Sequence, residues 1–374
     1  MTRPERLGAQ ERDRIYVRRI RPDLFAGSSA ATTPVALIVA GQPGAGVPTA
    51  ASRLRRELLK TAGPAVHLCA DRLRAYHPAD RTVEGPNASW LELDVADWFD
   101  RAMQDARQHR VHLLIENELD DGKASLPNLA VALRKAAYVV QTVFVSTDPA
   151  WSRILLLARH DLGRGRGLPC AVTTILKHDA AVAQVRLVMG QLEDRRAVDG
   201  LRIIDVKGLQ FYENRLIDGE WVRAARAQAT LDVERDRVPP PRELVQLAMR
   251  WETLVRRLVN DPAVPRDLAS QVLRWRDEEV ARCDATPPGA QMLQWAREGA
   301  AFRAMERREF EKEFPHHGRA VKSLGLAILE AEKYPQHEGT RLVLHARENI
   351  AQRIERGDMA RIAARDKPQE PPTR

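Results

Sequence analysis

The sequence predicts an α/β protein: a P-loop NTPase-type, mostly parallel sheet flanked by helices, followed by an α-helical C-terminal region. Short apolar runs rich in β-branched residues alternate with helical patterns in the first part of the chain, as in sheets whose parallel strands are joined by crossover helices. A glycine-rich turn directly follows the first apolar run. Past the stretch VPPP, only amphipathic helical patterns remain.

The glycine-rich turn spans residues 41–46, between a strand expected at 35–40 and a helix expected at 48–60. The strand is one continuous apolar run, which is typical of strands buried on both faces. Three leucines mark one face of the helix: Leu54, Leu58 and Leu59. Strand, glycine loop and helix form a P-loop, which directs backbone N–H groups and a helix N-terminus at phosphate oxygens. The residues expected to bind nucleotide are Gly41, Gln42, Pro43, Gly44, Ala45, Gly46, Val47, Pro48 and Thr49.

The P-loop motif departs from the full pattern, G-x-x-x-x-G-K-[ST], at its last two positions. Gly41 and Gly46 match, but Val47 occupies the lysine position and Pro48 the hydroxyl position. The lysine normally reaches the outer phosphates and the hydroxyl normally ligates Mg²⁺. Thr49 is one residue too late for that role. Proline suits the first turn of a helix, so we expect the fold to be retained while the phosphate chemistry is weakened.

Strand and helix patterns continue on both sides of this motif. Before it, residues 9–25 read as a helix that ends before Pro22, because proline disfavours helical geometry in the preceding residue. Further apolar runs predict strands at 66–70, 111–115, 139–145 and 201–206. Amphipathic spacing predicts helices at 95–110, 125–137, 149–160 and 172–194, with polar loops at 79–90 and 163–169.

The stretch VPPP after Arg235 marks a domain boundary. We expect a P-loop domain over residues 1–235, a helical region over 236–366 and a disordered tail over 367–374. Turn signals divide the helical region into segments at 241–260, 266–283, 290–314, 319–333 and 339–365. Three tryptophans are expected in its core: Trp251, Trp275 and Trp295.

The composition argues against several classes of protein. The 374 residues contain no apolar run of the roughly 18 residues that a membrane span needs, and the charged N-terminus lacks the apolar core of a signal peptide. The net charge of +8 could suit nucleic acid, but arginines alternate with acidic residues in the C-terminal third and aromatic residues make up only 5%. We therefore expect a cytoplasmic protein with no membrane contact, and we do not expect nucleic acid as a partner.

Cysteine and histidine spacing predicts neither a disulfide framework nor a metal site. Cys69, Cys170 and Cys283 are odd in number and far apart in the sequence. The adjacent His316 and His317 have no carboxylate or cysteine partner at the usual ligand spacing. No bound metal is therefore expected from the protein's own ligand pattern.

Polar residues follow three of the predicted strands: the glycine loop, Asp71 and Glu116. The carboxyl ends of parallel strands share one edge of a sheet, where such sheets bind their ligands. Taken singly, each residue has a structural explanation. An aspartate after a strand is often a helix N-cap, and a glutamate there can be solvated or can pair with an arginine. Three polar clusters at successive strand ends nevertheless favour a functional site.

Several segments occur in a distinctive order and spacing. They are RPDLFAG before the first strand, PVALIVAGQPGAG, ADRLRAYHP, the strand ending at Glu116, AAYVVQTVFVSTDPAWS, the arginine-rich segment 159–169 with the later His178-Asp179, and the last strand with YEN. Together, from about Ile15 to Trp221, they resemble the zeta-toxin family of P-loop kinases. The resemblance implies a kinase that phosphorylates a UDP-activated amino sugar, typically UDP-N-acetylglucosamine, using ATP and Mg²⁺.

The resemblance also implies roles for individual residues. Asp71 matches the family's catalytic base, which accepts the proton of the attacking sugar hydroxyl. Arg159 and Arg164 fall where the family places catalytic arginines that neutralise the transferring phosphate. The GRGRG repeat leaves the register between Arg164 and Arg166 open. Three residues match positions that hold substrate or phosphate: Arg74, Glu116 and Arg166.

Three functions remain open at this point. The first is the ATP-dependent kinase, in this family usually a toxin silenced by a small helical antitoxin. The second is a pseudokinase that acts through partners, which Val47 and Pro48 favour. Glu118 also favours it, because the family commonly has threonine there and a carboxylate is unfavourable beside a diphosphate. The third is a helical interaction or nucleic-acid-binding protein built on the C-terminal region, which the interspersed charges disfavour.

Overall fold

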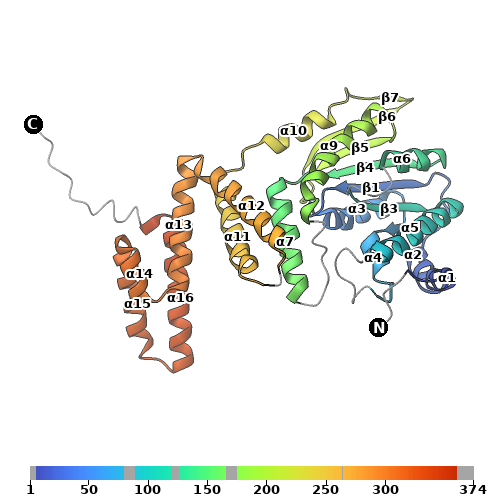
Figure 1. Cartoon of the computed structure of the whole chain (residues 1–374). Coiled ribbons are helices and arrows are strands. Elements are labelled where there is room, and N and C mark those ends of the chain that lie inside the picture. Colours follow the sequence, from blue (N-terminus) through green and yellow to red (C-terminus); the bar gives the residue numbers. More distant parts are fainter. Residues whose placement is uncertain (1–5, 80–88, 120–125, 166–174, 263, 360–374) are drawn as a thin grey trace, which may run out of the picture. The chain divides into compact units, whose positions relative to one another are not determined.

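The computed structural model describes residues 6–79, 89–119, 126–165, 175–262 and 264–359. The chain divides into two compact units, Met1–Arg237 and Val238–Arg374 (Figure 1). The first unit contains a sheet with flanking helices, whereas the described part of the second unit is helical. Among the described residues, no helix is both long enough and apolar enough to cross a membrane.

Seven strands in the described part of the chain form one sheet, in the order β2-β3-β1-β4-β5-β6-β7 (Figure 1). Five strands are parallel: β1 Val35–Gly41, β2 Ala65–Leu68, β3 His112–Glu118, β4 Val139–Val145 and β5 Gly200–Ile204. Two continue the sheet antiparallel: β6 Gln210–Ile217 and β7 Glu220–Trp221. The predicted mostly parallel sheet is confirmed, and the β6–β7 hairpin is an addition that the sequence analysis does not predict.

Helices precede and connect these strands. An N-terminal helical run consists of α1 Ala9–Ile15, the π-helical turn η1 Tyr16–Ile20, and α2 Arg21–Phe25. The other helices in the described part of the first unit are α3 Val47–Thr61, α4 Ala70–Arg74, α5 Ser89–His109, α6 Leu126–Lys135, α7 Pro149–Gly165, α9 His178–Asp194 and α10 Ala227–Asp236.

Both faces of the central strands are buried, and the side chains alternate between the faces with the period of two that strands impose. In β1, Ala36, Ile38 and Ala40 belong to one hydrophobic cluster, while Leu37 and Val39 belong to another. The first cluster also includes residues of the N-terminal run, α5, α6, α9 and α10, and the second includes residues of α3. Burial on both sides explains why β1 reads as one continuous apolar run.

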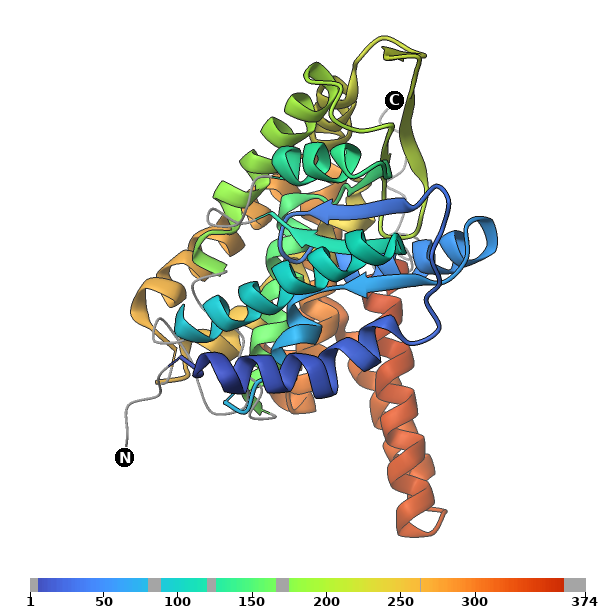
Figure 2. The same ribbon diagram turned by 90° about the vertical axis from the view of Figure 1, so that its right-hand side faces the viewer.

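The N-terminal helical run lies along α5 (Figure 2). The indole nitrogen of Trp98 donates to the carbonyl of Arg12 at 3.1 Å, and the Tyr16 hydroxyl donates to Asp105 at 2.8 Å. The tyrosine ring is fully buried. These contacts place the first helices on the same face of the sheet as α5.

This run does not end before Pro22 as the sequence predicts, but continues to Phe25. Proline lacks an N–H and its ring crowds the carbonyl of the preceding turn. The π-helical turn just before it widens the backbone, and the N–H of Arg21 bonds to the carbonyl of Tyr16, five residues back. The prediction was wrong because this widened turn lets the helix accommodate proline.

Two further predictions about helices were wrong. Helix α5 begins at Ser89 rather than 95, inside the predicted polar loop, because Leu91 joins the hydrophobic cluster beside β1. In α3, Leu54 and Leu58 are buried as predicted, but Leu59 is 55% exposed. Leu59 follows Leu58 directly and therefore lies about 100° around the helix from it, toward solvent.

The turn after β1 is held by two left-handed glycines. Gly44 and Gly46 have φ values of +80° and +90°, where residues with a Cβ are strained. A Cβ on Gly44 would lie 2.2 Å from the backbone oxygen of Ser152, and one on Gly46 would lie 2.6 Å from Cγ2 of Val206. The glycines thus allow close contact with the segments after β4 and β5.

The described part of the second unit contains helices of unequal length (Figure 1), which pack around two apolar clusters. They are α11 Pro241–Val259, α12 Arg266–Asp284, α13 Pro287–Ala304, α14 Arg307–Glu313, the 3₁₀ turn η3 Pro315–His317, α15 Gly318–Ala331 and α16 Gln336–Glu355. Trp251 and Trp275 are buried as predicted and meet edge to face at 6.0 Å. Trp295 is only partly buried and packs over Gly357.

The helix predicted at 290–314 is interrupted, because the backbone of Met305 is extended between α13 and α14. This break returns the chain on itself, so that Phe302 and Phe310 meet edge to face at 4.9 Å in one cluster. No glycine or proline marks the break. The packing of the two aromatic rings, rather than local sequence, accounts for it.

An ion-pair group joins α13 to α16. Arg303 donates from Nε to Glu348 at 2.8 Å and from Nη2 to the same carboxylate at 3.0 Å, and it also pairs with Glu355. The hydrogen bond from Arg303 lowers the pKa of Glu348 from 4.5 to about 2. The two glutamates in turn raise the pKa of Arg303.

The depressed pKa of Glu348 predicts an acid-sensitive contact. Because its pKa is lower in the folded state than in the unfolded chain, its stabilising effect should be complete above about pH 4.5 and should be lost as the pH falls toward 2. Glu348→Gln should flatten this part of the pH dependence in urea denaturation followed by circular dichroism. Glu332→Gln, at the end of α15, is the control and should leave the dependence intact. An unchanged profile for Glu348→Gln would contradict the assignment.

Two glycines with nearly the same φ value allow the cost of backbone strain to be measured apart from the cost of a steric clash. Gly44 and Gly219 have nearly equal φ values, +80° and +79°, but a Cβ on Gly219 would meet nothing within 4 Å. Gly219→Ala should cost about 1–2 kcal/mol for the left-handed backbone alone. Gly44→Ala should cost about 1–3 kcal/mol more, because the methyl group overlaps the Ser152 backbone. Equal losses in the urea midpoints of the two full-length variants would refute the close contact.

Candidate active site

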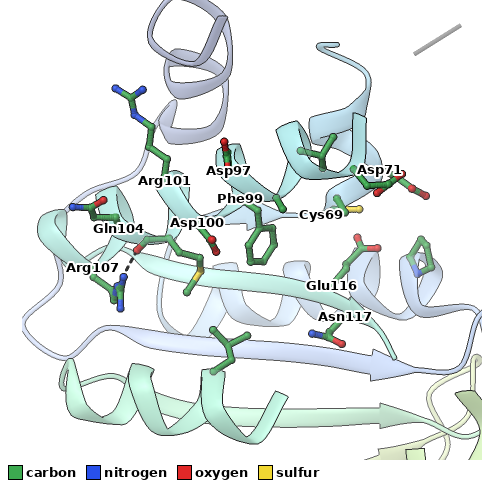
Figure 3. A pocket seen from close by; sticks show the side chains of 17 residues that line it. Cys69, Asp71, Asp97, Phe99, Asp100, Arg101, Gln104, Arg107, Glu116 and Asn117 are labelled. Atoms are coloured by element: carbon green, nitrogen blue, oxygen red, sulfur yellow. Dashed lines mark hydrogen bonds between the residues drawn. The ribbon is translucent and has the colours of Figure 1, made fainter. Parts of the chain in front are cut away.

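A cavity of about 910 Å³ lies in the first unit, between α5 and the ends of β2 and β3 (Figure 3). Its lining includes Pro48 at the start of α3 and residues of α4, α5, β3 and α6. Seven of the lining side chains carry a formal charge: Asp71, Glu92, Asp97, Asp100, Glu116, Arg101 and Arg107. Figure 3 shows Asp71, Cys69 and Glu116 toward one end of the cavity and Arg101, Gln104 and Arg107 toward the other.

Asp71 is the centre of an ion-pair cluster at its end of the cavity. It lies in the first turn of α4, whose N-cap residue is Cys69, so Asp71 is not the N-cap. It accepts a hydrogen bond from Nη1 of Arg74 at 3.0 Å and another from Nη2 of Arg159 at 2.9 Å. Arg74 also pairs with Glu92 on α5. Three residues singled out in the sequence, from α4 and α7, are therefore in direct contact.

Glu116 is held by a histidine that the sequence analysis does not single out. Nη1 of Arg72 lies 2.9 Å from Nδ1 of His67, and Nε2 of the same ring lies 2.6 Å from the Glu116 carboxylate. Arginine can only donate, so Nδ1 accepts and Nε2 carries the hydrogen that is donated to Glu116. The carboxylate is thereby fixed in orientation at the end of β3.

Cys69 lies between these two groups and lines the cavity. Burial, with a further contribution from the charge of Glu116, raises the pKa of its thiol to about 11. The thiol is therefore protonated at neutral pH and is a poor nucleophile. The charged groups at this end of the cavity are therefore carboxylates and arginines, and the thiol is not one of them.

The inner side of the glycine loop is apolar. Val47, at the position of the P-loop lysine, is 1% exposed and belongs to the same cluster as Ala45 and Leu54. Its Cγ2 lies 3.0 Å from where a Cβ of Gly41 would be. The valine side chain therefore covers the beginning of the loop and directs no polar group toward it.

Polar contacts brace the outer side of the same loop. The buried side chain of Gln42 donates from Nε2 to the carbonyl of Thr147 at 2.9 Å, and the Thr147 hydroxyl donates to the carbonyl of Ala45 at 2.9 Å. Nε2 of Gln42 also lies 3.4 Å from Oγ of Ser152, which in turn lies 2.8 Å from Nε2 of His178. The loop is thus tied to the segment after β4 and to α9.

His178 continues this chain of contacts to the protein surface. Its Nδ1 lies 3.0 Å from Oδ1 of Asp179, which also accepts from Nε of Arg153 at 2.9 Å. The hydrogen bond with His178, followed by those from Arg153, lowers the pKa of Asp179 to about 2. Ser152 and His178 are fully buried, so this group of residues positions the loop and is closed to substrate.

The remaining predicted residues are only partly described. Arg164 lies near the end of α7, but its side chain is outside the described residues, and Arg166 is outside them entirely. The side chain of Glu118 is likewise outside them. Pro48 and Thr49 are exposed at the start of α3, and Pro48 borders the cavity. Of the predicted arginines, Arg74 and Arg159 are therefore the two whose contacts with Asp71 are described.

Several polar residues of the cavity lie on α5 and are absent from the sequence predictions. Asp97 is paired with Arg6 and Arg12, and Arg107 donates from Nε to the carbonyl of Met103 at 3.3 Å. Their side chains project from one helix at intervals of three or four residues, together with Arg101 and Gln104. The only indication of these residues in the sequence is that polar positions alternate with apolar ones along that helix.

Comparison with known proteins gives one family and several structural relatives. The family model described as Zeta toxin matches residues 23–217. No curated protein gave a significant sequence match. The most informative structural match is to the PezAT chromosomal toxin–antitoxin system of Streptococcus pneumoniae. It has a TM-score of 0.55 and 19% identity, and covers 69% of this chain and 100% of the matched chain.

Two weaker structural matches are complexes of AvrRxo1-ORF1 with AvrRxo1-ORF2. One contains sulphate ions, with a TM-score of 0.40, 15% identity, and coverage of 73% of this chain and 85% of that chain. The other contains ATP, with a TM-score of 0.41, 14% identity, and coverage of 73% and 87%. Sequence identities this low establish at most a shared fold.

The matched family region begins in α2 and ends with β6, so it includes the glycine loop, Asp71, Glu116 and Arg159. It covers more than half of the 374 residues. The parallel strand order, the glycine loop after β1 and the polar strand ends agree with this match. The chain belongs to the zeta toxin family.

Proposed function

We propose that this protein is an ATP-dependent phosphotransferase that phosphorylates a hydroxyl group of a UDP-activated amino sugar, of the UDP-N-acetylglucosamine type. The observation that carries the proposal is the contact of Asp71 with Arg74 and Arg159 beside the cavity. Membership in the zeta toxin family supports the class of reaction. The size of the cavity, about 910 Å³, suits a ligand as large as a nucleotide sugar.

In this proposal Asp71 is the general base. Its carboxylate would accept the hydroxyl proton while the sugar oxygen forms a bond to the γ-phosphorus and the bond to the leaving diphosphate breaks. The side chain is 45% exposed and faces the cavity, so a substrate hydroxyl can approach it. A correctly placed base of this kind contributes roughly 10²–10⁴-fold to the rate.

The two arginines would supply positive charge where phosphate charge develops. Arg159 is 59% exposed and Arg74 is 31% exposed, so both can turn from Asp71 toward a bound phosphate. Guanidinium groups bind phosphate oxygens in a bidentate manner. Moving them away would also remove two hydrogen-bond donors from the carboxylate that is to accept the proton. Glu116, oriented by His67, would hold a hydroxyl or amide group of the sugar nucleotide.

The glycine loop has features that suit the phosphates of ATP but lacks the usual side-chain ligand for Mg²⁺. The loop has the glycine conformations and the following helix N-terminus that suit phosphate oxygens. Val47, however, provides no charge, and Pro48 provides neither a hydroxyl ligand for Mg²⁺ nor an N–H for phosphate. Residues Gly41 to Thr49 would therefore hold the nucleotide through the backbone, with Arg74 and Arg159 supplying the cationic side chains.

A protein partner is part of the same proposal. The structure with a TM-score of 0.55 to this chain is described as a toxin–antitoxin system. By analogy, we propose that a small helical antitoxin binds the first unit and restrains its activity. Domain limits at residues 1–235 and 236–366 remain our proposal for how the catalytic and helical parts are divided.

A second candidate function is favoured by the burial of Val47. An apolar side chain, 1% exposed, occupies the position from which a lysine would reach the phosphates. Loss of one transition-state charge contact typically lowers a rate by about a hundredfold to a thousandfold. A pseudokinase, folded but without effective catalysis, would then act as a binding module for a protein partner.

The catalytic role of Asp71 can be tested with UDP-N-acetylglucosamine and ATP. Asp71→Asn keeps the size of the side chain but cannot accept the proton, so turnover should fall at least a hundredfold. Product formation can be followed by phosphorus NMR. Asp218→Asn, in the β6–β7 turn, is the control and should retain activity, since asparagine tolerates the left-handed backbone found there. Full activity of Asp71→Asn would exclude it as the base.

Calorimetric titration with ATP and Mg²⁺ distinguishes the two functions. In the phosphotransferase, the natural protein should bind ATP, and a Val47→Lys, Pro48→Thr double variant should bind it about 10–150-fold more tightly, as expected for one charge-assisted contact. In the pseudokinase, the natural protein should not bind at millimolar ATP, whereas the double variant should. Circular dichroism checks that the variant is folded, because the lysine replaces a buried side chain. Failure of both proteins to bind would reject the loop as a nucleotide site.

A further inference from the structure

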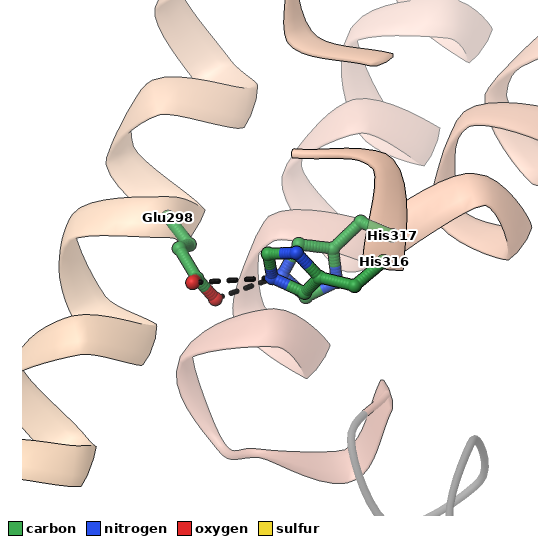
Figure 4. Close-up of side chains that lie close together, drawn as sticks. All are labelled: Glu298, His316 and His317. Atoms are coloured by element: carbon green, nitrogen blue, oxygen red, sulfur yellow. Dashed lines mark hydrogen bonds and ion pairs between the residues drawn. The ribbon is translucent and has the colours of Figure 1, made fainter. Parts of the chain in front are cut away.

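The helical second unit contains a group of metal-ligating side chains that the proposed kinase function does not use. Glu298 on α13 faces His316 and His317 of η3 (Figure 4). One nitrogen or oxygen atom of each residue lies within 4.8 Å of the others. The sequence predicts no metal site here, because no carboxylate or cysteine lies at the usual ligand spacing from the two histidines. In the fold, however, Glu298 lies beside them. We propose that this group is a binding site for Zn²⁺.

The distances between ligand atoms suit a zinc ion. Oε2 of Glu298 lies 2.8 Å from Nε2 of His317, and Oε1 lies 3.2 Å from Nε2 of His316. Zinc bonds of about 2.0–2.1 Å in tetrahedral geometry place neighbouring ligand atoms about 3.3–3.4 Å apart. These two contacts use different oxygens of the carboxylate, and the ligand atoms of the whole group lie within 4.8 Å of one another, so the side chains would reorient to surround the ion. Two imidazoles and one carboxylate form a donor set found in zinc sites that keep the fourth position open.

The charge of the site also favours a cation. Glu298 is about 4% exposed, and burial of a carboxylate is costly unless it is paired. In the described part of the chain its ion-pair partners are the two histidines, with no lysine or arginine among them. By contrast, the equally buried Glu279 pairs with Arg282. A divalent ion bound there would place a permanent positive charge beside the carboxylate.

The surrounding residues hold two ligands rigidly and leave the third accessible. Gln294 donates from Nε2 to Oε1 of Glu298 at 2.9 Å, and the ring of His317 stacks on Phe310 at 5.9 Å. The side chain of His317 is 4% exposed, whereas that of His316 is 56% exposed. The solvent side of His316 therefore provides both a route for the ion and room for a water molecule as the fourth ligand.

The site would link α13 to the turn before α15, across 18 residues of sequence (298 to 316). Hard cations such as Mg²⁺ and Ca²⁺ are less suitable, since they prefer oxygen ligands, whereas imidazole with carboxylate favours zinc and its neighbours among the first-row metals. The ion would fix the corner at which α14 and η3 return toward α13.

The test is calorimetric titration of the metal-free full-length protein with Zn²⁺. We expect one Zn²⁺ per chain that binds with micromolar or tighter affinity, and at least tenfold weaker binding in His316→Ala and in Glu298→Gln. His337→Ala is the matched control, because this histidine of the same unit is 83% exposed and lies outside the group. Glu298→Gln keeps hydrogen-bond capacity, and His316→Ala changes an exposed residue, so both variants should fold, as circular dichroism can check.

Cobalt substitution provides a second readout. Co²⁺ at the site should give visible absorption bands of a low-coordinate ion, and these bands should be lost in Glu298→Gln and retained in His337→Ala. Zinc should also raise the unfolding temperature of the natural protein more than that of His316→Ala. The proposal is overturned if the natural protein binds zinc only at millimolar concentration. It is also overturned if both site variants bind zinc as the natural protein does, since the histidines would then serve only as hydrogen-bond partners of Glu298.

Discussion

The packing of Val47 against the start of the glycine loop is the contact on which the candidate site depends. The side chain is buried in the cluster between β1 and α3, and its Cγ2 would touch a Cβ at Gly41. Val206 covers Gly46 in the same way. The loop is thus held in place by apolar contacts and by Gln42. This accounts for a P-loop conformation that survives the loss of the lysine.

Ion pairs between different elements then position the polar side chains around the cavity. Asp71 connects α4 to α7 through Arg159, Arg74 connects α4 to α5 through Glu92, and His67 connects β2 to β3 through Glu116. The two arginine–carboxylate pairs are partly exposed and contribute about 0–1 kcal/mol each to stability, whereas the His67–Glu116 pair is largely buried. A main effect of all three pairs is geometric, because they set the relative positions of groups that come from five separate elements.

The sequence predicted the parallel sheet, the glycine loop and the family because these depend on local patterns. A strand that is buried on both faces appears in the sequence as an apolar run, and a glycine-rich turn appears as closely spaced glycines. The π-helical turn before Pro22, the break at Met305 and the partner of Glu116 were not predictable in this way. The π-helical turn is a backbone arrangement that no residue pattern marks, and the break follows the packing of Phe302 against Phe310. The partner of Glu116 lies 49 residues away in the sequence. The carboxylate beside His316 was missed for the same reason.

The pairing of Asp71 with two arginines has a consequence for how the site responds to its surroundings. In the structure the cations rest on the group proposed to accept the proton. In the proposed function, an incoming phosphate would therefore have to displace Arg74 and Arg159 from Asp71, which favours ligands with several negative charges. Since these pairs are partly exposed, dissolved salt weakens them, with a screening length of about 8 Å at physiological ionic strength. Binding of such a ligand would accordingly depend on ionic strength.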